Sequence, residues 1–140
     1  MSVNAKKLKK PAISISRTDH DRLSKLAGSH SGSNADVANE LLRELDRARI
    51  VSDAGISSRK AVRMGSRLRY ATDAGQEREI VLTYPGQADI EAGRVSILTP
   101  IGVALIGLSS GQSIDWIAPN GRVNSLYVIE VIEADEPALP

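Results

Sequence analysis

The 140-residue sequence contains no cysteine and no phenylalanine, and aromatic residues make up only 3% of it. Without cysteine the chain forms no disulfide, no thiolate metal site and no cysteine nucleophile. With one tryptophan and three tyrosines, the core must be aliphatic, and aromatic platforms for single-stranded nucleic acid are poorly supplied. No apolar run reaches the roughly 18 residues of a membrane span. The basic N-terminus has no apolar segment behind it that would indicate a secretory signal. We therefore expect a cytoplasmic protein that does not bind membranes.

Residues typical of catalytic or metal sites are also scarce. The only histidines, His20 and His30, lie in polar surroundings without the paired spacing of a metal site, so we interpret both as surface residues. No serine lies in a nucleophile elbow, and the isolated glycines do not form a phosphate-binding loop. The sequence thus predicts no catalytic residue, no metal, no cofactor and no small-molecule substrate. We expect that the protein is not an enzyme.

The net charge of +1 conceals two halves of opposite sign. Residues 1–60 hold 12 Lys and Arg against 7 Asp and Glu, which gives +5, whereas residues 61–140 hold 6 against 10, which gives −4. This asymmetry indicates a two-part molecule and disfavours a uniformly basic nucleic-acid binder. We expect residues 1–11 to form a basic flexible arm and residues 134–140 a frayed acidic tail.

The pattern of residues 12–52 predicts an antiparallel helical hairpin, that is, a truncated coiled coil. Thr18 with Asp21 resembles a capping box at the start of the first helix. From Ala35 the second helix carries an apolar stripe over about 17 residues, or roughly 25 Å. Its remaining faces carry Glu–Arg pairs three residues apart, such as Glu44 with Arg47, which we interpret as a solvated surface.

After a linker at residues 53–62, the signals change to those of a sheet domain at residues 63–133. Apolar and β-branched runs between turns predict about five mostly antiparallel strands, near residues 67–70, 79–84, 94–98, 113–117 and 125–132. One short apolar helix interrupts them, with Thr99 as its N-cap, Pro100 in its first turn and apolar residues to Leu108. The predicted fold class is therefore α+β.

The motifs of this domain resemble one known family. They comprise Met64–Ser66, Thr83–Asp89, Gly93–Gly107, Gly111–Ile114 and Ala118–Gly121. Together they are similar to the C-terminal domain of the Gre transcript-cleavage factors over about residues 60–132. The resemblance implies an FKBP-like fold, in which a twisted antiparallel sheet wraps one short buried helix.

The N-terminal half is similar to the Rnk branch of the Gre-like proteins, through Asn39–Ala48 and Ile13–Ile15. The resemblance implies a bacterial regulator that binds RNA polymerase at the rim of its secondary channel and meets nucleic acid only indirectly. The docking loop of the family is the segment that enters the short helix. On this chain the contact residues would be Leu98, Thr99, Pro100 and Ile101. We expect a monomer.

One departure from the family matters for function. Full Gre factors carry an acidic pair at the hairpin tip that holds a catalytic Mg²⁺, but the tip at Gly28–Asn34 has no acid. The expectation is docking without stimulation of transcript cleavage. Two alternatives stay open: a DNA-binding regulator that uses the basic N-terminal hairpin, and an adaptor for another protein. A prolyl isomerase, suggested by fold analogy, lacks the aromatic lining of its pocket.

Overall fold

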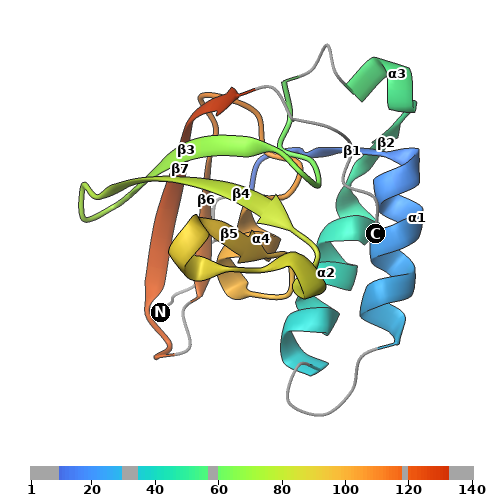
Figure 1. The fold of residues 1–140 in the computed structure, drawn as a ribbon, viewed down its shortest axis with the longest axis horizontal. Helices are drawn as coiled ribbons and strands as arrows, with labels where there is room; N and C mark the ends of the chain where they lie inside the picture. Colours follow the sequence, from blue (N-terminus) through green and yellow to red (C-terminus); the bar gives the residue numbers. More distant parts are fainter. Residues whose placement is uncertain (1–9, 30–34, 57–59, 118–119, 133–140) are drawn as a thin grey trace, which may run out of the picture.

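A curled sheet and a pair of helices stand side by side, and one short helix lies between them (Figure 1). The computed structural model describes residues 10–29, 35–56, 60–117 and 120–132. The helix pair consists of α1 (Arg17–Gly28) and α2 (Ala35–Arg47), which run antiparallel. The short helix is α4 (Pro100–Leu105). The expected arm at 1–11, apart from residues 10 and 11, and the tail at 134–140 lie outside the described residues.

The ends of the helical hairpin differ from the prediction. Helix α1 begins two residues earlier than expected, because the hydroxyl of Ser16, not that of Thr18, accepts a hydrogen bond from the Asp19 amide at 3.1 Å. Helix α2 has 13 residues and therefore a length of about 20 Å, rather than 17 residues and 25 Å. It ends early because the chain after it becomes a strand.

That strand, β2 (Arg49–Val51), pairs in parallel with β1 (Ser14–Ser16), and Ile15 lies opposite Ile50. The two strands hold together the open end of the hairpin, where α1 begins and α2 ends. The alternation Ile13-Ser14-Ile15 in the sequence is typical of a short strand, whereas β2 was not predicted. The short helix α3 (Asp53–Ile56) follows, within the segment expected to be a linker.

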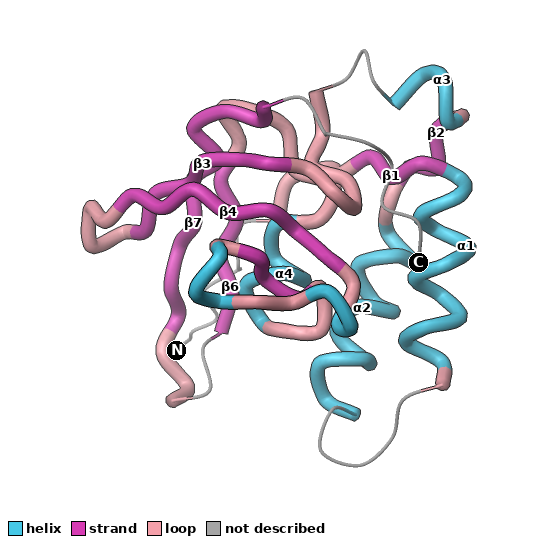
Figure 2. The backbone as a smooth tube through the Cα atoms, in the orientation of Figure 1, coloured by secondary structure: helices cyan, strands magenta, loops and turns pink. Residues whose placement is uncertain are grey.

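The strands of the main sheet, magenta in Figure 2, follow the order β5-β4-β3-β7-β6. All neighbours are antiparallel except the parallel pair β4–β5. Two 3-10 turns, η3 (Pro85–Gln87) and η4 (Ile90–Ala92), connect that parallel pair. The α+β fold class is confirmed, with a helical hairpin followed by a mostly antiparallel sheet around one short helix. The five strands are β3 (Arg67–Thr72), β4 (Glu77–Thr83), β5 (Arg94–Ser96), β6 (Ser113–Ile117) and β7 (Val123–Ile132).

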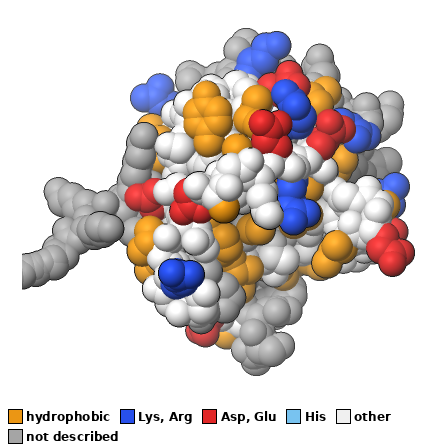
Figure 3. Space-filling model, turned by 90° about the vertical axis from the view of Figure 1, so that its left-hand side faces the viewer, with side chains coloured by type: hydrophobic (Ala, Val, Ile, Leu, Met, Phe, Trp, Pro, Cys, Tyr) orange, Lys and Arg blue, Asp and Glu red, His pale blue; other side chains and the backbone are white. Residues whose placement is uncertain are grey.

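The outer face of the sheet carries charges of both signs. A guanidinium nitrogen of Arg67 lies 3.3 Å from a carboxylate oxygen of Glu79. Guanidinium nitrogens of Arg69 lie 3.6 Å from a carboxylate oxygen of Glu77 and 3.3 Å from one of Glu130. Figure 3 shows the side of the molecule where β3, β4 and β7 lie, and basic, acidic and hydrophobic side chains interleave on it. Exposed pairs of this kind add little stability, so we interpret them as a solvated surface.

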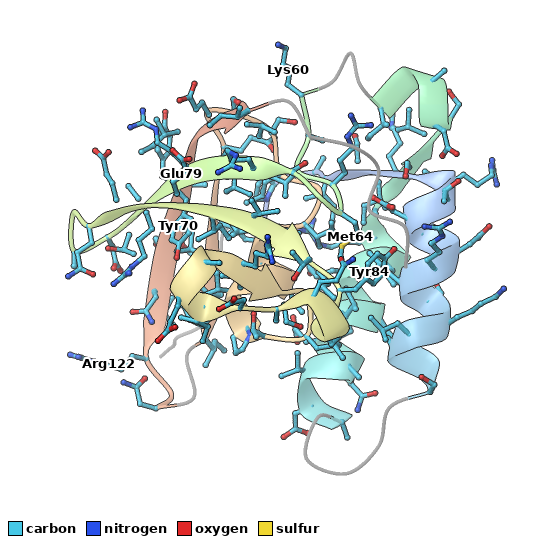
Figure 4. All side chains as sticks on the ribbon, in the orientation of Figure 1. Lys60, Met64, Tyr70, Glu79, Tyr84 and Arg122 are labelled. Carbon is cyan, nitrogen blue, oxygen red and sulfur yellow. The ribbon has the colours of Figure 1, made fainter. Side chains whose placement is uncertain are left out.

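One aliphatic core joins the hairpin to the sheet. Leu23 and Leu41 from the helix pair belong to the same buried cluster as Leu68, Leu105 and Leu126 from the sheet side. Met64 and Tyr84 lie at the side of the sheet that faces the helix pair (Figure 4). The hairpin is therefore packed onto its own sheet by burial of apolar surface, the dominant favourable contribution to folding.

The apolar segment after α4 does not continue the helix to Leu108 as predicted. The helix ends at Leu105, because Ile106 leaves the helical conformation with a ψ of 130°, and Gly107 follows with a left-handed φ of +83°. Its N–H donates to the carbonyl of Val62 at 2.8 Å, and its own carbonyl accepts from the Ser14 amide at 3.2 Å. A Cβ at Gly107 would lie 2.8 Å from the Cβ of Ile13. The backbone of this segment thus bridges the hairpin and the sheet domain.

Two polar residues of the hairpin are less exposed than predicted. Glu44 is only 3% exposed, and both its carboxylate oxygens accept from Arg47, at 2.9 and 3.0 Å. Arg47 also donates to the Pro11 carbonyl at 2.7 Å. The interpretation of His20 as a surface residue is wrong, because its half-buried ring donates from Nε2 to the Leu45 carbonyl at 3.1 Å. His30 lies outside the described residues.

A half-buried carboxylate joins α1 to the start of the sheet domain. The Oδ2 of Asp19 accepts from the Met64 amide at 3.1 Å. Burial raises the pKa of Asp19 above its ordinary value, against the effect of this hydrogen bond and of the nearby Arg63 and Arg22. By contrast, hydrogen bonds from the hydroxyl and the amide of Thr18 lower the pKa of Asp53.

The close approach at Gly107 predicts a stability difference between two glycines of like conformation. Gly75 has a φ of +85° and open space where a Cβ would lie, whereas Gly107 combines φ +83° with the contact to Ile13. Gly75→Ala is expected to lower the free energy of unfolding by about 1–2 kcal/mol, because alanine disfavours the left-handed conformation. Gly107→Ala is expected to lower the free energy of unfolding by roughly 1–3 kcal/mol more, because the new methyl group would overlap Ile13. Urea denaturation measures both, and equal costs would contradict the close approach.

The pKa shifts of Asp19 and Asp53 predict opposite pH dependences of stability. The raised pKa of Asp19 means that its proton stabilises the fold, so this contribution is lost as pH rises through the folded pKa. Asp19→Asn is therefore expected to gain stability relative to wild type as pH increases from about 3.5 to about 7. The lowered pKa of Asp53 has the opposite sign: its contribution is complete above the ordinary pKa and is lost as pH falls through the lowered value. Asp53→Asn is therefore expected to lose stability relative to wild type as pH rises from about 2 to about 5. Denaturation curves at several pH values check this, and slopes of the same sign would contradict it.

Candidate functional site

The corner that leads from β5 into α4 is held by three hydrogen bonds. The hydroxyl of Thr99 donates to the Ser96 carbonyl at 2.8 Å and accepts from the Gly102 amide at 3.0 Å. The hydroxyl of Ser96 accepts from the Leu98 amide at 3.0 Å. Thr99 is the N-cap of the helix and Pro100 is in its first turn, as predicted. These bonds fix the conformation of a surface corner only a few residues long.

Gly102 lets the corner fold back onto the end of the strand. A Cβ at this position would lie 2.4 Å from the Ser96 carbonyl oxygen and 2.9 Å from the Cα of Ile97. Atoms cannot approach so closely, so any larger residue would push α4 away from β5. The glycine is thus required by a close approach rather than by an unusual backbone angle.

The four residues expected to contact a partner differ in exposure. Leu98 is 8% exposed and belongs to the buried core, whereas Thr99, Pro100 and Ile101 are half-buried at the surface. Ile101 also packs partly against the core. The structure therefore brings Thr99, Pro100 and Ile101 together at an accessible corner, and Leu98 supports them from below.

A groove of about 600 Å³ begins at this corner and separates α2 from β6. Its floor is apolar and comes from α4, through Pro100, Val103 and Ala104. One wall is α2, which contributes charged residues and Val37, and the other wall is the strand Ile114–Ile117. The volume lies in the range of ligand-binding clefts in proteins.

Charged side chains surround the groove. The Nζ of Lys10 lies 3.3 Å from the Oε2 of Glu40 and 3.6 Å from the Oε2 of Glu44. The Nη2 of Arg43 lies 3.2 Å from the Oε1 of Glu40. Asp36 on α2 and Asp115 on β6 also line it. The four acids against two bases give the lining a net charge of −2. The groove thus combines an apolar floor with an acidic rim.

The groove was not predicted from the sequence, although one residue indicates it. Trp116, the single tryptophan of the chain, lines the groove, and its Nε1 is buried without a hydrogen-bond partner in the described part of the structure. A buried indole N–H usually has a hydrogen-bond partner. A single tryptophan in an otherwise aliphatic sequence is therefore a candidate for a binding groove.

Among the described residues, no three His, Cys, Asp or Glu side chains gather closely enough to hold a metal ion. None of the helices in the described ranges is long and apolar enough to cross a membrane.

Comparisons with known proteins match both halves of the chain. The family model "Transcription elongation factor, GreA/GreB, C-term" matches residues 57–133, and the model "Rnk N-terminus" matches residues 11–51. The chain is 31% identical over 132 residues to the "Regulator of nucleoside diphosphate kinase" of Escherichia coli strain K12, which covers 94% of this chain and 96% of the relative. It is 32% identical over 126 residues to the "Transcription elongation factor GreA" of Azorhizobium caulinodans, with 86% and 78% covered.

A solved structure is similar over nearly the whole fold. It is the "Prokaryotic transcription elongation factor GreA/GreB from Nitrosomonas europaea", with a TM-score of 0.68 and 34% sequence identity. The match covers 89% of this chain and 100% of that one, so it includes both the helix pair and the sheet.

Proposed function

The chain belongs to the GreA/GreB family of transcription elongation factors and carries an Rnk-type N-terminal part, and from this we propose a transcription regulator that binds RNA polymerase in the cytoplasm. Its named relatives are regulators or transcription factors rather than enzymes, which fits a protein that acts by binding. We propose that it acts as a monomer.

The proposed docking surface is the corner Thr99–Ile101, at the rim of the polymerase secondary channel. The observation that supports this proposal is the half-buried corner, which is held by hydrogen bonds and is the segment to which the family resemblance assigns docking. The hydrogen bonds of Thr99 hold the corner in one conformation before binding, so little conformational entropy is lost when a partner lands. Pro100 adds a fixed backbone angle and an apolar contact surface.

The hairpin supports docking without stimulated transcript cleavage. Its helices have 12 and 13 residues, so each is about 18–20 Å long. The tip sequence Gly28–Asn34, which lies mostly outside the described residues, contains no carboxylate that could hold Mg²⁺. A short hairpin without tip acids would occupy the channel without supplying metal ligands to the polymerase active site. The protein would then compete with other channel-binding factors.

Direct binding to duplex DNA gains no support from the described surface. The exposed face of α2 mixes Glu40 and Asp46 with Arg43, and the outer sheet face pairs arginines with glutamates. Duplex binding needs lysines and arginines that are free to replace counterions at phosphates.

Substitutions at the corner are expected to weaken binding to core RNA polymerase. In the double variant Thr99→Asp/Pro100→Ala, the aspartate still caps α4 but brings an uncompensated charge into the contact. We expect retention on immobilised core polymerase to fall at least about tenfold. Lys25→Ala, an exposed change on α1, is the control and is expected to bind like wild type. Equal retention of wild type, the double variant and Lys25→Ala would contradict the assignment of the docking surface. Failure of the wild-type protein to bind core polymerase would contradict the proposed function.

The purified protein is expected not to stimulate RNA cleavage in arrested elongation complexes. Added in excess together with a cleavage-competent Gre factor, it is expected to slow cleavage, because the two would compete for one channel. The length of the nascent RNA on a gel measures both effects. Cleavage at rates typical of Gre factors with this protein alone would contradict the proposal.

A further inference from the structure

The groove between α2 and β6 has one feature beyond its shape: a free strand edge runs along it. In the order β5-β4-β3-β7-β6, the strand β6 lies at the end, and within the described residues no other strand pairs with its outer side. Unpaired N–H and C=O groups on such an edge are ready to pair with another extended chain.

The lining residues show that the edge of β6, and not one of its faces, forms the groove wall. Side chains of a strand point alternately to opposite faces, yet the four consecutive residues Ile114–Ile117 all line the groove. Ile114 is buried and Ile117 is 57% exposed, so the groove passes from the inner to the outer side of the sheet along this edge.

We propose that this groove is a docking site for an extended segment of a partner protein, which adds to β6 as a further strand. The segment would place apolar side chains on the floor of Pro100, Val103 and Ala104. Main-chain hydrogen bonds to the strand edge would supply affinity, and the pockets for alternate side chains would supply selectivity.

The charges of the walls define the chemistry of the segment. Acids lie on both walls, Asp36 on α2 and Asp115 on β6, where the Oδ1 of Asp115 accepts from the Ser125 hydroxyl at 2.7 Å. The bases Lys10 and Arg43 pair with Glu40 and Glu44, so the lining keeps its net charge of −2. An acidic rim repels acidic segments and favours lysine or arginine next to the apolar positions. The occupant is therefore an extended peptide in which apolar and basic residues alternate.

Trp116 provides the means to detect an occupant of the groove. Its side chain lines the groove, so a bound segment changes the surroundings of the indole. Because it is the only tryptophan of the chain, its fluorescence reports on this groove alone.

The test titrates the full chain with three blocked heptapeptides while the fluorescence of Trp116 is recorded. The first alternates lysine and valine, the second alternates glutamate and valine, and the third is the first with its central valine replaced by proline. We expect saturable binding of the lysine peptide. The glutamate and proline peptides are expected to bind at least about tenfold more weakly, because of charge repulsion and of a lost N–H with an altered backbone.

Two variants of α2 test whether the acidic rim is used. Asp36→Lys reverses a charge that lines the groove, and affinity for the lysine peptide is expected to fall at least about threefold. Asp46→Lys makes the same exposed change on the same helix away from the groove and is expected to have no effect. Thr99→Asp changes a residue outside the groove lining and is expected to leave peptide binding intact. Loss of peptide binding can therefore be told apart from loss of polymerase binding at the corner.

Several outcomes would overturn the proposal. Absence of saturation up to about 1 mM lysine peptide, equal binding of the three peptides, or equal effects of the two α2 variants would each remove it. A dimer in sedimentation whose formation abolishes peptide binding would assign the groove to a second copy of the chain. Tighter peptide binding after Lys6, Lys7 and Lys9 are changed to glutamate would assign it to the chain's own N-terminal residues.

Discussion

The backbone contact between Gly107 and the hairpin is the constraint on which the arrangement of the whole molecule depends. At this point the chain after α4 hydrogen-bonds to Ser14 on one side and to Val62 on the other, and Ile13 fills the space where a side chain would stand. The two halves of the chain therefore meet through main-chain atoms as well as through the aliphatic core. With that contact fixed, the helix pair lies against α4, and the groove between α2 and β6 follows as a consequence.

Gly102 in the first turn of α4 and Gly107 just beyond the helix serve one segment in different ways. Gly102 allows the helix to begin directly against the end of β5, which holds the Thr99–Pro100 corner at the surface. Gly107 ends the same apolar segment against the hairpin. The sequence of residues 99–108 predicts only a buried helix. In the structure this segment also forms a surface corner and joins two parts of the fold.

Local signals in the sequence were sufficient to predict most of the elements, but not the contacts between distant segments. The Thr-Pro cap, the apolar stripe of α2 and the alternating strands are all encoded within a few residues, and the structure has them. The strand β2 forms only because Ile15, 35 residues earlier, lies opposite Ile50. Likewise, Ser16 displaced Thr18 as N-cap because Asp53, far along the chain, binds Thr18. The corner was predictable from a motif, whereas the groove needed three elements to be placed in space.

The short helix α4 gives the corner and the groove a common structural base. Pro100 belongs to both, and Val103 and Ala104 form the groove floor one turn later on the same helix. A capped helix of six residues, buried along most of its length, cannot bend in the middle without breaking the packing of its core. A partner on the corner and a segment in the groove would therefore contact the same rigid body. Their mutual orientation is set by the fold rather than by either ligand.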